Sequence, residues 1–110
     1  MTVTVNDIIK ELSLEVINLF DGNKTVEGGY TGDLLSWVMS RAENKNAWIT
    51  IMNNSNIIAV AALLDLSCII LSENVAIDYN LKKLANEKNI NLLRSEKDSF
   101  TLCYKLGKLI

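Results

Sequence analysis

Histidine and proline are both absent from this chain of 110 residues, and only two cysteines are present. Without histidine the chain lacks the most common metal ligand and the only side chain whose unperturbed pKa lies near neutral pH. A Ser-His or Cys-His nucleophile is therefore excluded. The cysteines, Cys68 and Cys103, each stand in an apolar stretch, which predicts two buried free thiols, and their spacing indicates no metal site.

The chain also has no excess of basic residues and no long apolar run. Its 11 basic and 13 acidic residues give a net charge of -2. The longest basic cluster is Lys82-Lys83, so a nucleic-acid interface is not expected. The longest apolar run, residues 57–64, is far shorter than the ~20 residues that span a membrane, and the N-terminus does not resemble a signal peptide. We therefore expect a cytoplasmic protein without nucleic-acid or membrane partners.

The composition is that of a folded domain, with 49% hydrophobic and 22% charged residues. The length suits a single domain over residues 1–110. Hydrophobic periodicity predicts helices over 7–12, 34–42, 57–66, 78–89 and 100–109, and strands over 14–19, 25–30, 47–51, 68–71 and 90–93. Because strands and helices alternate from residue 47 onward, we expect an α/β domain: a mostly parallel or mixed sheet of about four to five strands with helices packed on it.

Two of these helices carry specific expectations about burial. The segment 57–66 is apolar almost all round, which predicts a helix buried on every side. In the last helix, the residues expected to make apolar contacts are Phe100, Leu102, Tyr104, Leu106 and Leu109. The candidate helix caps are Asn6 or Thr4, Asp33, Ser55 or Asn56, and Asp98 or Ser99.

The most distinctive segment is Gly28-Gly29-Tyr30-Thr31-Gly32-Asp33-Leu34-Leu35-Ser36. Its glycines either supply positive φ angles in a strand-to-helix connection, or present free N–H groups to an anion or a nucleotide phosphate. Asp33 favours the structural interpretation, because a carboxylate that caps the helix occupies those amides and repels phosphate. The ligand candidates in this segment are Gly28, Gly29, Tyr30, Gly32 and Asp33.

A second candidate is the polar tetrad Asn53-Asn54-Ser55-Asn56. It follows a predicted strand and precedes a helix, so it would lie at the carboxyl ends of the strands, where open α/β sheets bind ligands. Its amides and hydroxyl suit a base or a ribose better than a phosphate. The alternative is a polar turn with an N-cap.

Other side chains give weaker indications. The carboxylates Asp21, Glu27 and Asp33 fit no cation-binding loop, so neither a metal nor a cofactor is expected. Trp37, Trp48 and Tyr30 could stack on a base, but tryptophan on a helix or a strand more often belongs to a core or an interface.

Several segments, in this order, resemble the DRTGG domain family: 28–36, Trp48-Ile49-Thr50, Asn56-Ile57-Ile58-Ala59-Val60-Ala61 and Ile69-Ile70-Leu71. The resemblance covers essentially the whole chain. Of the name-giving Asp-Arg-Thr-Gly-Gly only the glycines are present, in Thr25-Val26-Glu27-Gly28-Gly29. The chain is similar to stand-alone bacterial DRTGG proteins, which are often labelled HPr serine kinase homologues and sometimes lie near iron-hydrogenase genes. The resemblance implies a regulatory or assembly module, often at a dimer interface.

The kinase label is not expected to transfer, because a P-loop needs glycines around a Lys-Ser/Thr pair and Gly107-Lys108 is followed by Leu109. We predict a non-catalytic regulatory or interaction domain that forms a homodimer through its apolar helices and senses a nucleotide or another small anionic metabolite. Two alternatives stay open. One is an accessory scaffold for a redox complex associated with iron hydrogenase, and the other is a kinase-like enzyme completed by a protein partner.

Overall fold

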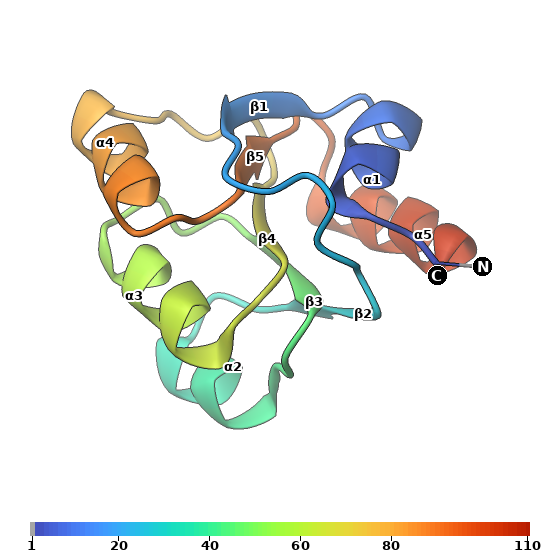
Figure 1. The fold of residues 1–110 in the computed structure, drawn as a ribbon, viewed down its shortest axis with the longest axis horizontal. Coiled ribbons are helices and arrows are strands. Elements are labelled where there is room, and N and C mark those ends of the chain that lie inside the picture. Colours follow the sequence, from blue (N-terminus) through green and yellow to red (C-terminus); the bar gives the residue numbers. More distant parts are fainter. Residues whose placement is uncertain (1) are drawn as a thin grey trace.

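A five-stranded sheet with helices on both faces is the framework of the computed structural model, which describes residues 2–110 (Figure 1). The predicted α/β class and the predicted mixed, mostly parallel sheet are confirmed. In chain order the elements are α1 (Val5–Glu11), β1 (Glu15–Asn18), β2 (Gly28–Thr31), α2 (Leu35–Arg41), β3 (Asn46–Thr50), α3 (Asn56–Leu64), β4 (Cys68–Leu71), α4 (Tyr79–Glu87), β5 (Leu92–Arg94) and α5 (Ser99–Leu109).

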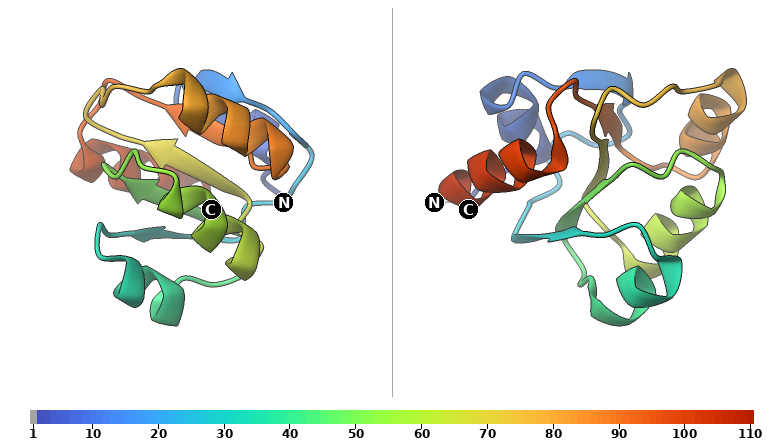
Figure 2. Two further views of the ribbon diagram at one scale, coloured as in Figure 1. Left: turned by 90° about the vertical axis from the view of Figure 1, so that its left-hand side faces the viewer. Right: turned by 180° about the vertical axis from the view of Figure 1, so that it is seen from behind.

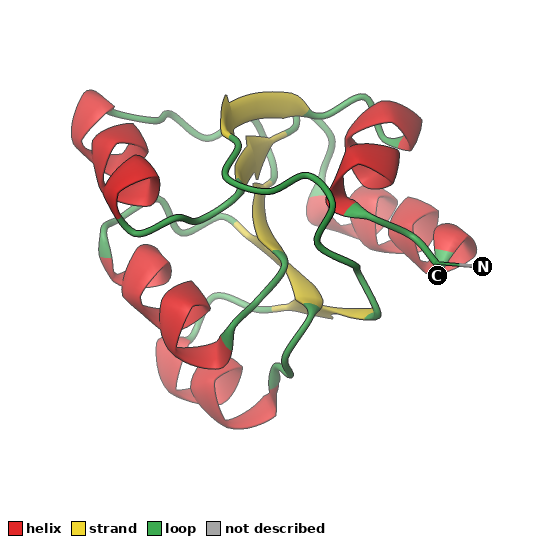
Figure 3. Ribbon diagram, in the orientation of Figure 1, coloured by secondary structure: helices red, strands yellow, loops and turns green. Residues whose placement is uncertain are grey.

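The strands lie in the order β1-β5-β4-β3-β2. The four strands from β2 to β5 are parallel, and β1 pairs antiparallel with β5. One row of the register runs from Tyr30 through Trp48 and Ile69 to Leu92. The crossover helices α2, α3 and α4 form one layer on one face, and α1 and α5 lie together on the other face (Figures 2 and 3). The parallel strands β2, β3, β4 and β5 thus lie side by side in the order in which they occur in the chain.

The sheet separates two apolar cores, as expected when both faces of parallel strands are covered. Successive residues of β3, such as Trp48 and Ile49, contribute to opposite cores, and both side chains are buried. The core under α2, α3 and α4 includes Val38, Trp48, Ile57, Ile69, Leu71, Leu81 and Leu92. The core under α1 and α5 includes Val5, Ile8, Ala47, Ile49, Ile70, Leu93, Leu102 and Leu106.

Two of the predicted helix caps, Thr4 and Asp98, are present, and Asp78 provides a third cap that was not predicted. The Thr4 hydroxyl accepts the N–H of Asp7, and the Asp7 carboxylate accepts the N–H of Thr4, which is a complete capping box. Asp78 accepts the N–H of Leu81 at the start of α4. At the start of α5, the Asp98 carboxylate accepts the N–H of Thr101.

The burial expected for two helices is wrong in part. In α3 the side chains of Ala59, Ala62 and Leu63 are exposed, and Leu63 is 69% exposed. In α5, Leu102 and Leu106 are buried as expected, but Phe100 and Tyr104 are 81% and 56% exposed. Each helix touches the sheet along one side only, so an apolar outer side in a single chain faces solvent. No helix among residues 2–110 is both long enough and apolar enough to cross a membrane.

Candidate functional site

The connections that follow the parallel strands meet at the carboxyl edge of the sheet. They include Gly32 and Asp33 after β2, and residues 51–55 after β3. The segment 72–78 follows β4 and leads into α4. Parallel strands all end at the same edge, and open α/β sheets bind ligands there. This edge is therefore where the sequence analysis predicts a ligand site.

Asp33 does not cap α2, and that prediction is wrong. The N-cap position is Leu34, which makes no side-chain hydrogen bond to the helix. The Asp33 carboxylate instead accepts the hydroxyl of Thr50 at 2.7 Å and the N–H of Ile51 at 3.0 Å. It therefore joins the end of β2 to the end of β3, and it adds a negative charge beside the glycine segment that would repel a phosphate.

The glycines of this segment do not have the predicted positive φ angles. Gly28 and Gly29 are extended residues of β2. A β-carbon at Gly29 would come within 3.0 Å of Cδ2 of Leu106, so the glycine allows α5 to pack closely against the strand. The carbonyl of Gly32 accepts the indole N–H of Trp48 at 3.0 Å. Because Trp48 is fully buried, this bond anchors the connection to the core.

The tetrad 53–56 is held by its own amides. The Asn53 side-chain amide donates to the carbonyl of Ala76 at 2.7 Å, which links the connection after β3 to the connection before α4. The Asn54 side-chain oxygen accepts the N–H of Asn56 at 2.9 Å. Ser55 stands at the N-cap position of α3, but its side chain makes no capping hydrogen bond. The prediction that Ser55 or Asn56 caps the helix with its side chain is therefore wrong. The side chain of Asn54 accepts the first N–H of the helix instead.

The two predicted ligand segments contribute to different grooves. Gly29 and Tyr30 line an apolar groove of about 270 Å³ between β2 and α5. Asn53, Asn54 and Ser55 line a polar groove of about 510 Å³ beside α4. A crevice between strands forms where neighbouring crossovers leave to opposite faces of a sheet. Here all three crossovers cover one face, and that arrangement provides no crevice shared by the two segments.

The polar groove also contains side chains of α4 and of its N-cap residue that the sequence interpretation missed. The missed residues are Asp78, Asn80, Leu81, Lys83, Leu84 and Glu87. One signal could have indicated them, since the connections after β3 and β4 must meet at the same edge of a parallel sheet. Among the described residues that line this groove, Lys83 is the only cation, and Asp78 and Glu87 are the two carboxylates. The groove can therefore offer amides and hydroxyls to a base or a ribose, and one ammonium group to a phosphate.

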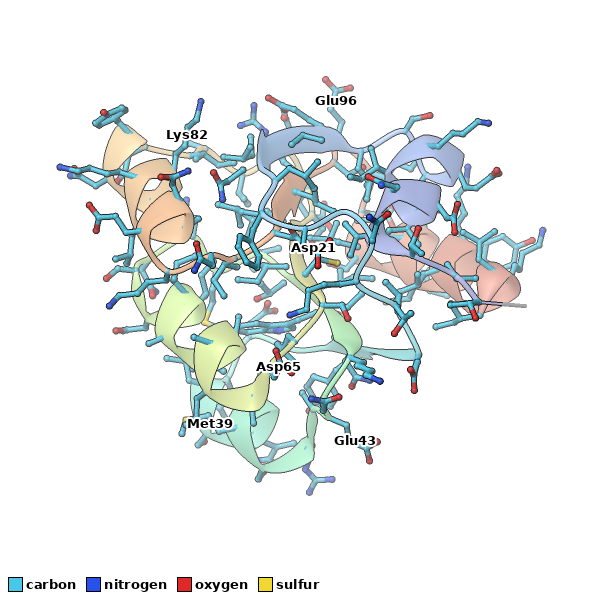
Figure 4. The ribbon with its side chains drawn as sticks, in the orientation of Figure 1. Asp21, Met39, Glu43, Asp65, Lys82 and Glu96 are labelled. Carbon is cyan, nitrogen blue, oxygen red and sulfur yellow. The ribbon has the colours of Figure 1, made fainter. Side chains whose placement is uncertain are left out.

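The titratable groups with altered pKa values lie outside the polar groove. Hydrogen bonding to the Lys24 ammonium group lowers the pKa of Asp65, which follows α3 (labelled in Figure 4). Burial raises the pKa of the Cys68 thiol to about 12. The predicted burial of both thiols is correct for Cys68, whereas Cys103 is partly exposed and lines the apolar groove. Within residues 2–110 no group of three His, Cys, Asp or Glu side chains could hold a metal ion.

The two tryptophans have different environments. Trp48 is a core residue, as predicted. Trp37 is 54% exposed on α2, and the guanidinium of Arg41 lies 4.2 Å from its ring centroid. This stack is a cation–π contact at the surface. Neither ring lines the polar groove.

Comparison with known proteins identifies a domain family and solved structures with a similar fold. The family model of the DRTGG domain matches residues 7–109. The fold is similar to that of the CBS and DRTGG domains of the regulatory region of Clostridium perfringens pyrophosphatase, complexed with its activator, diadenosine tetraphosphate. The TM-score is 0.77 at 20% identity, over 94% of this chain and 46% of that chain. This chain therefore spans less than half of that regulatory region. No curated protein sequence matches it.

Proposed function

Because this chain belongs to the DRTGG domain family, we propose that it is a non-catalytic regulatory domain that self-associates and senses a nucleotide or another small anionic metabolite. The observation that carries the proposal is the family match over residues 7–109, which includes every strand of the sheet. The likeness in fold to a regulatory region solved with diadenosine tetraphosphate supports adenine nucleotides as the first ligands to test.

We place the ligand in the polar groove beside α4. Asn53 and Asn54 on one side would bind a base or a ribose. Lys83 on the other side would bind a phosphate as a point charge. Asp78 and Glu87 could accept hydrogen bonds from ribose hydroxyls, but they also limit how much phosphate charge the groove tolerates. This charge balance favours a ligand with few phosphates close to the groove.

Ligand binding in this groove would be transmitted through the contact between its two sides. Asn53 and Ala76 already join these sides through one hydrogen bond of 2.7 Å. A ligand that contacts both Asn53 and Lys83 would add a second link between the start of α3 and α4. A ligand that binds only the folded state stabilises that state by mass action. We therefore expect ligand binding to increase the stability of the part of the domain that contains α3 and α4.

Isothermal titration tests the sensing part of the proposal. Diadenosine tetraphosphate, ATP, ADP, AMP and adenosine would be titrated separately into the protein. We expect saturable heat with at least one of them, and the same ligand should raise the melting temperature. If none of these compounds, and no guanine or pyrimidine nucleotide, produces saturable heat, the sensing part is wrong.

Two neighbouring lysines provide a matched pair of variants. Lys83 lines the groove, whereas Lys82 does not line it and is exposed on α4 (Figure 4). Lys83→Ala should weaken binding of a phosphorylated ligand about tenfold, as expected for one lost charge-assisted hydrogen bond. Lys82→Ala should leave the affinity nearly unchanged. Equal effects of both variants would show a general charge effect and would remove the groove from the proposal.

A further inference from the structure

The four residues of β2 contain none of the features that protect an end strand from pairing, and the nearest charged side chains, Glu27 and Asp33, lie just outside the strand. β2 is an end strand of the sheet. End strands usually carry a charged residue, a proline or a bulge that prevents pairing with another chain. Residues 28–31 of β2 include none of these. The other end strand, β1, has both a charged residue, Glu15, and an irregular register between Val16 and Asn18.

The pairing of β2 with β3 decides which backbone groups face outward. The N–H of Gly32 donates to the carbonyl of Ile49, and the hydrogen bonds of a parallel ladder use alternate residues. The backbone groups of Tyr30 therefore also face β3. The N–H and C=O groups of Gly29 and Thr31 point away from β3, and both of these residues are exposed.

We propose that β2 pairs in antiparallel orientation with β2 of a second copy of this chain, across a two-fold axis at Tyr30. In this register Gly29 of each copy lies opposite Thr31 of the other, and each such pair exchanges two hydrogen bonds. All outward backbone groups of these two residues are then paired. The inference deepens the self-association proposed above by naming its surface, and it needs no nucleotide.

The side chains of β2 fit this register. Thr31 meets Gly29, and Gly28 meets Gly32, so each of these pairs contains at least one glycine. Tyr30 alone faces its own equivalent, and directly opposed aromatic residues form a favourable cross-strand pair. The contact is thus self-complementary, as a two-fold interface requires.

The apolar groove beside β2 extends the proposed contact. Cys103, Gly107 and Ile110 line this groove from one flank of α5. Phe100 precedes Cys103 by three residues and lies on the same flank, with 81% of its surface exposed. A two-fold axis perpendicular to a continuous sheet places α5 of both copies on the same face. The two flanks would then cover each other and add apolar contact to the backbone hydrogen bonds.

Disulfide trapping tests the register directly. In the proposed pair the two Tyr30 residues are a non-hydrogen-bonded pair, with Cα atoms about 4.5 Å apart, a separation that a disulfide spans. In a Cys103→Ser background, Tyr30→Cys should form a covalent dimer under mild oxidation. Tyr104→Cys, at an exposed tyrosine of α5, should not. A Tyr30→Cys protein that crosslinks no better than Tyr104→Cys would overturn the register.

Sedimentation velocity tests the surface without a crosslink. The wild-type chain should dimerise, and Thr31→Lys should weaken the dimer by about tenfold or more, because a lysine on an end strand opposes pairing. Thr101→Lys places the same change on α5, outside the apolar groove, and should have little effect. Circular dichroism would show that both variants are folded. A monomeric wild type, or a dimer that Thr31→Lys does not weaken, overturns the inference.

The oligomeric state and the nucleotide heat are separate measurements. A wild-type dimer that gives no heat with any nucleotide supports this inference and contradicts only the sensing part of the proposed function. A monomer that binds a nucleotide overturns this inference and leaves the sensing part in place.

Discussion

The carboxylate of Asp33 lies 2.7 Å from the hydroxyl oxygen of Thr50 and so joins the ends of two neighbouring parallel strands. The same carboxylate oxygen accepts the N–H of Ile51, and the Thr50 oxygen accepts the N–H of Met52. Thr50 is buried. The contact holds the connection after β2 against the connection after β3, and it explains why Asp33 is not available to cap α2.

Asp33→Ala should destabilise the fold, because it leaves the buried Thr50 hydroxyl without its acceptor. The expected loss in the free energy of unfolding is about 1–3 kcal/mol, measured by urea denaturation. Asp33→Asn keeps an acceptor oxygen and should lose less. If Asp33→Ala changes stability by no more than a surface substitution does, about 0.5 kcal/mol, the contact contributes little.

Asn91→Ala should be among the most destabilising polar substitutions. Asn91 is buried, and its side-chain oxygen accepts the N–H groups of Phe20 and Asp21. Its side-chain NH₂ donates to the carbonyls of Asp21 and Ser67. Removing the amide leaves several backbone groups unpaired, so we expect a loss of about 3 kcal/mol. The measurement is again urea denaturation, with Asn80→Ala as the control at an exposed asparagine. Similar midpoints for the two variants would contradict the prediction.

The ion pair between Lys24 and Asp65, with 3.0 Å between Nζ and Oδ1, should make a small pH-dependent contribution to stability. The Lys24 ammonium group lowers the pKa of Asp65 in the folded state. The contribution is therefore fully present above the unfolded pKa of an aspartate and is lost as the pH falls through the lower, folded pKa. Because the Asp65 side chain is 66% exposed, the contribution should stay below about 1 kcal/mol.

Comparison of the wild type with Asp65→Asn measures this contribution. Asparagine tolerates the left-handed backbone of residue 65 (φ 52°), so the variant removes the charge without adding backbone strain. The difference in unfolding free energy should be constant near neutral pH and should shrink under acidic conditions, below about pH 4. A difference that grows on acidification would contradict the assigned direction.

The two thiols should react at very different rates. Cys68 is fully buried, and its pKa is raised to about 12, so its reactive thiolate is scarce at neutral pH. Cys103 is partly exposed. A thiol reagent should therefore label one cysteine per native chain and two in denaturant, and Cys103→Ser should abolish the fast phase. Rapid labelling of both thiols in the native protein would show that β4 opens readily.

Local sequence signals predicted most of the elements, because they depend on residues close together in the chain. Alternation of apolar runs with helical periodicity predicts β3, β4 and the helices between the parallel strands. The caps Thr4 and Asp98 follow from side chains three residues before the N–H groups that they accept. Cys68 to Leu71, all apolar, indicates an interior parallel strand, and all four residues are buried.

Predictions that depended on distant residues were less successful. Asp33 has the spacing of a cap, yet its carboxylate accepts hydrogen bonds from residues 17 and 18 positions later in the chain. The apolar outer side of α3 suggests complete burial, but burial depends on what other elements cover. Only the order of the strands shows that the two candidate ligand segments line separate grooves.

The sequence by itself determined the α/β class, the alternation of strands and helices and the resemblance to one domain family, because hydrophobic periodicity and short motifs are properties of neighbouring residues. The tertiary structure decided the role of the glycine segment. Three crossovers on one face leave β2 at the end of the sheet, with Gly29 and Thr31 facing outward and Asp33 turned to β3. β2 is an end strand only in the assembled sheet. The sequence of residues 28–36 does not indicate on which side of the strand a neighbouring strand is absent.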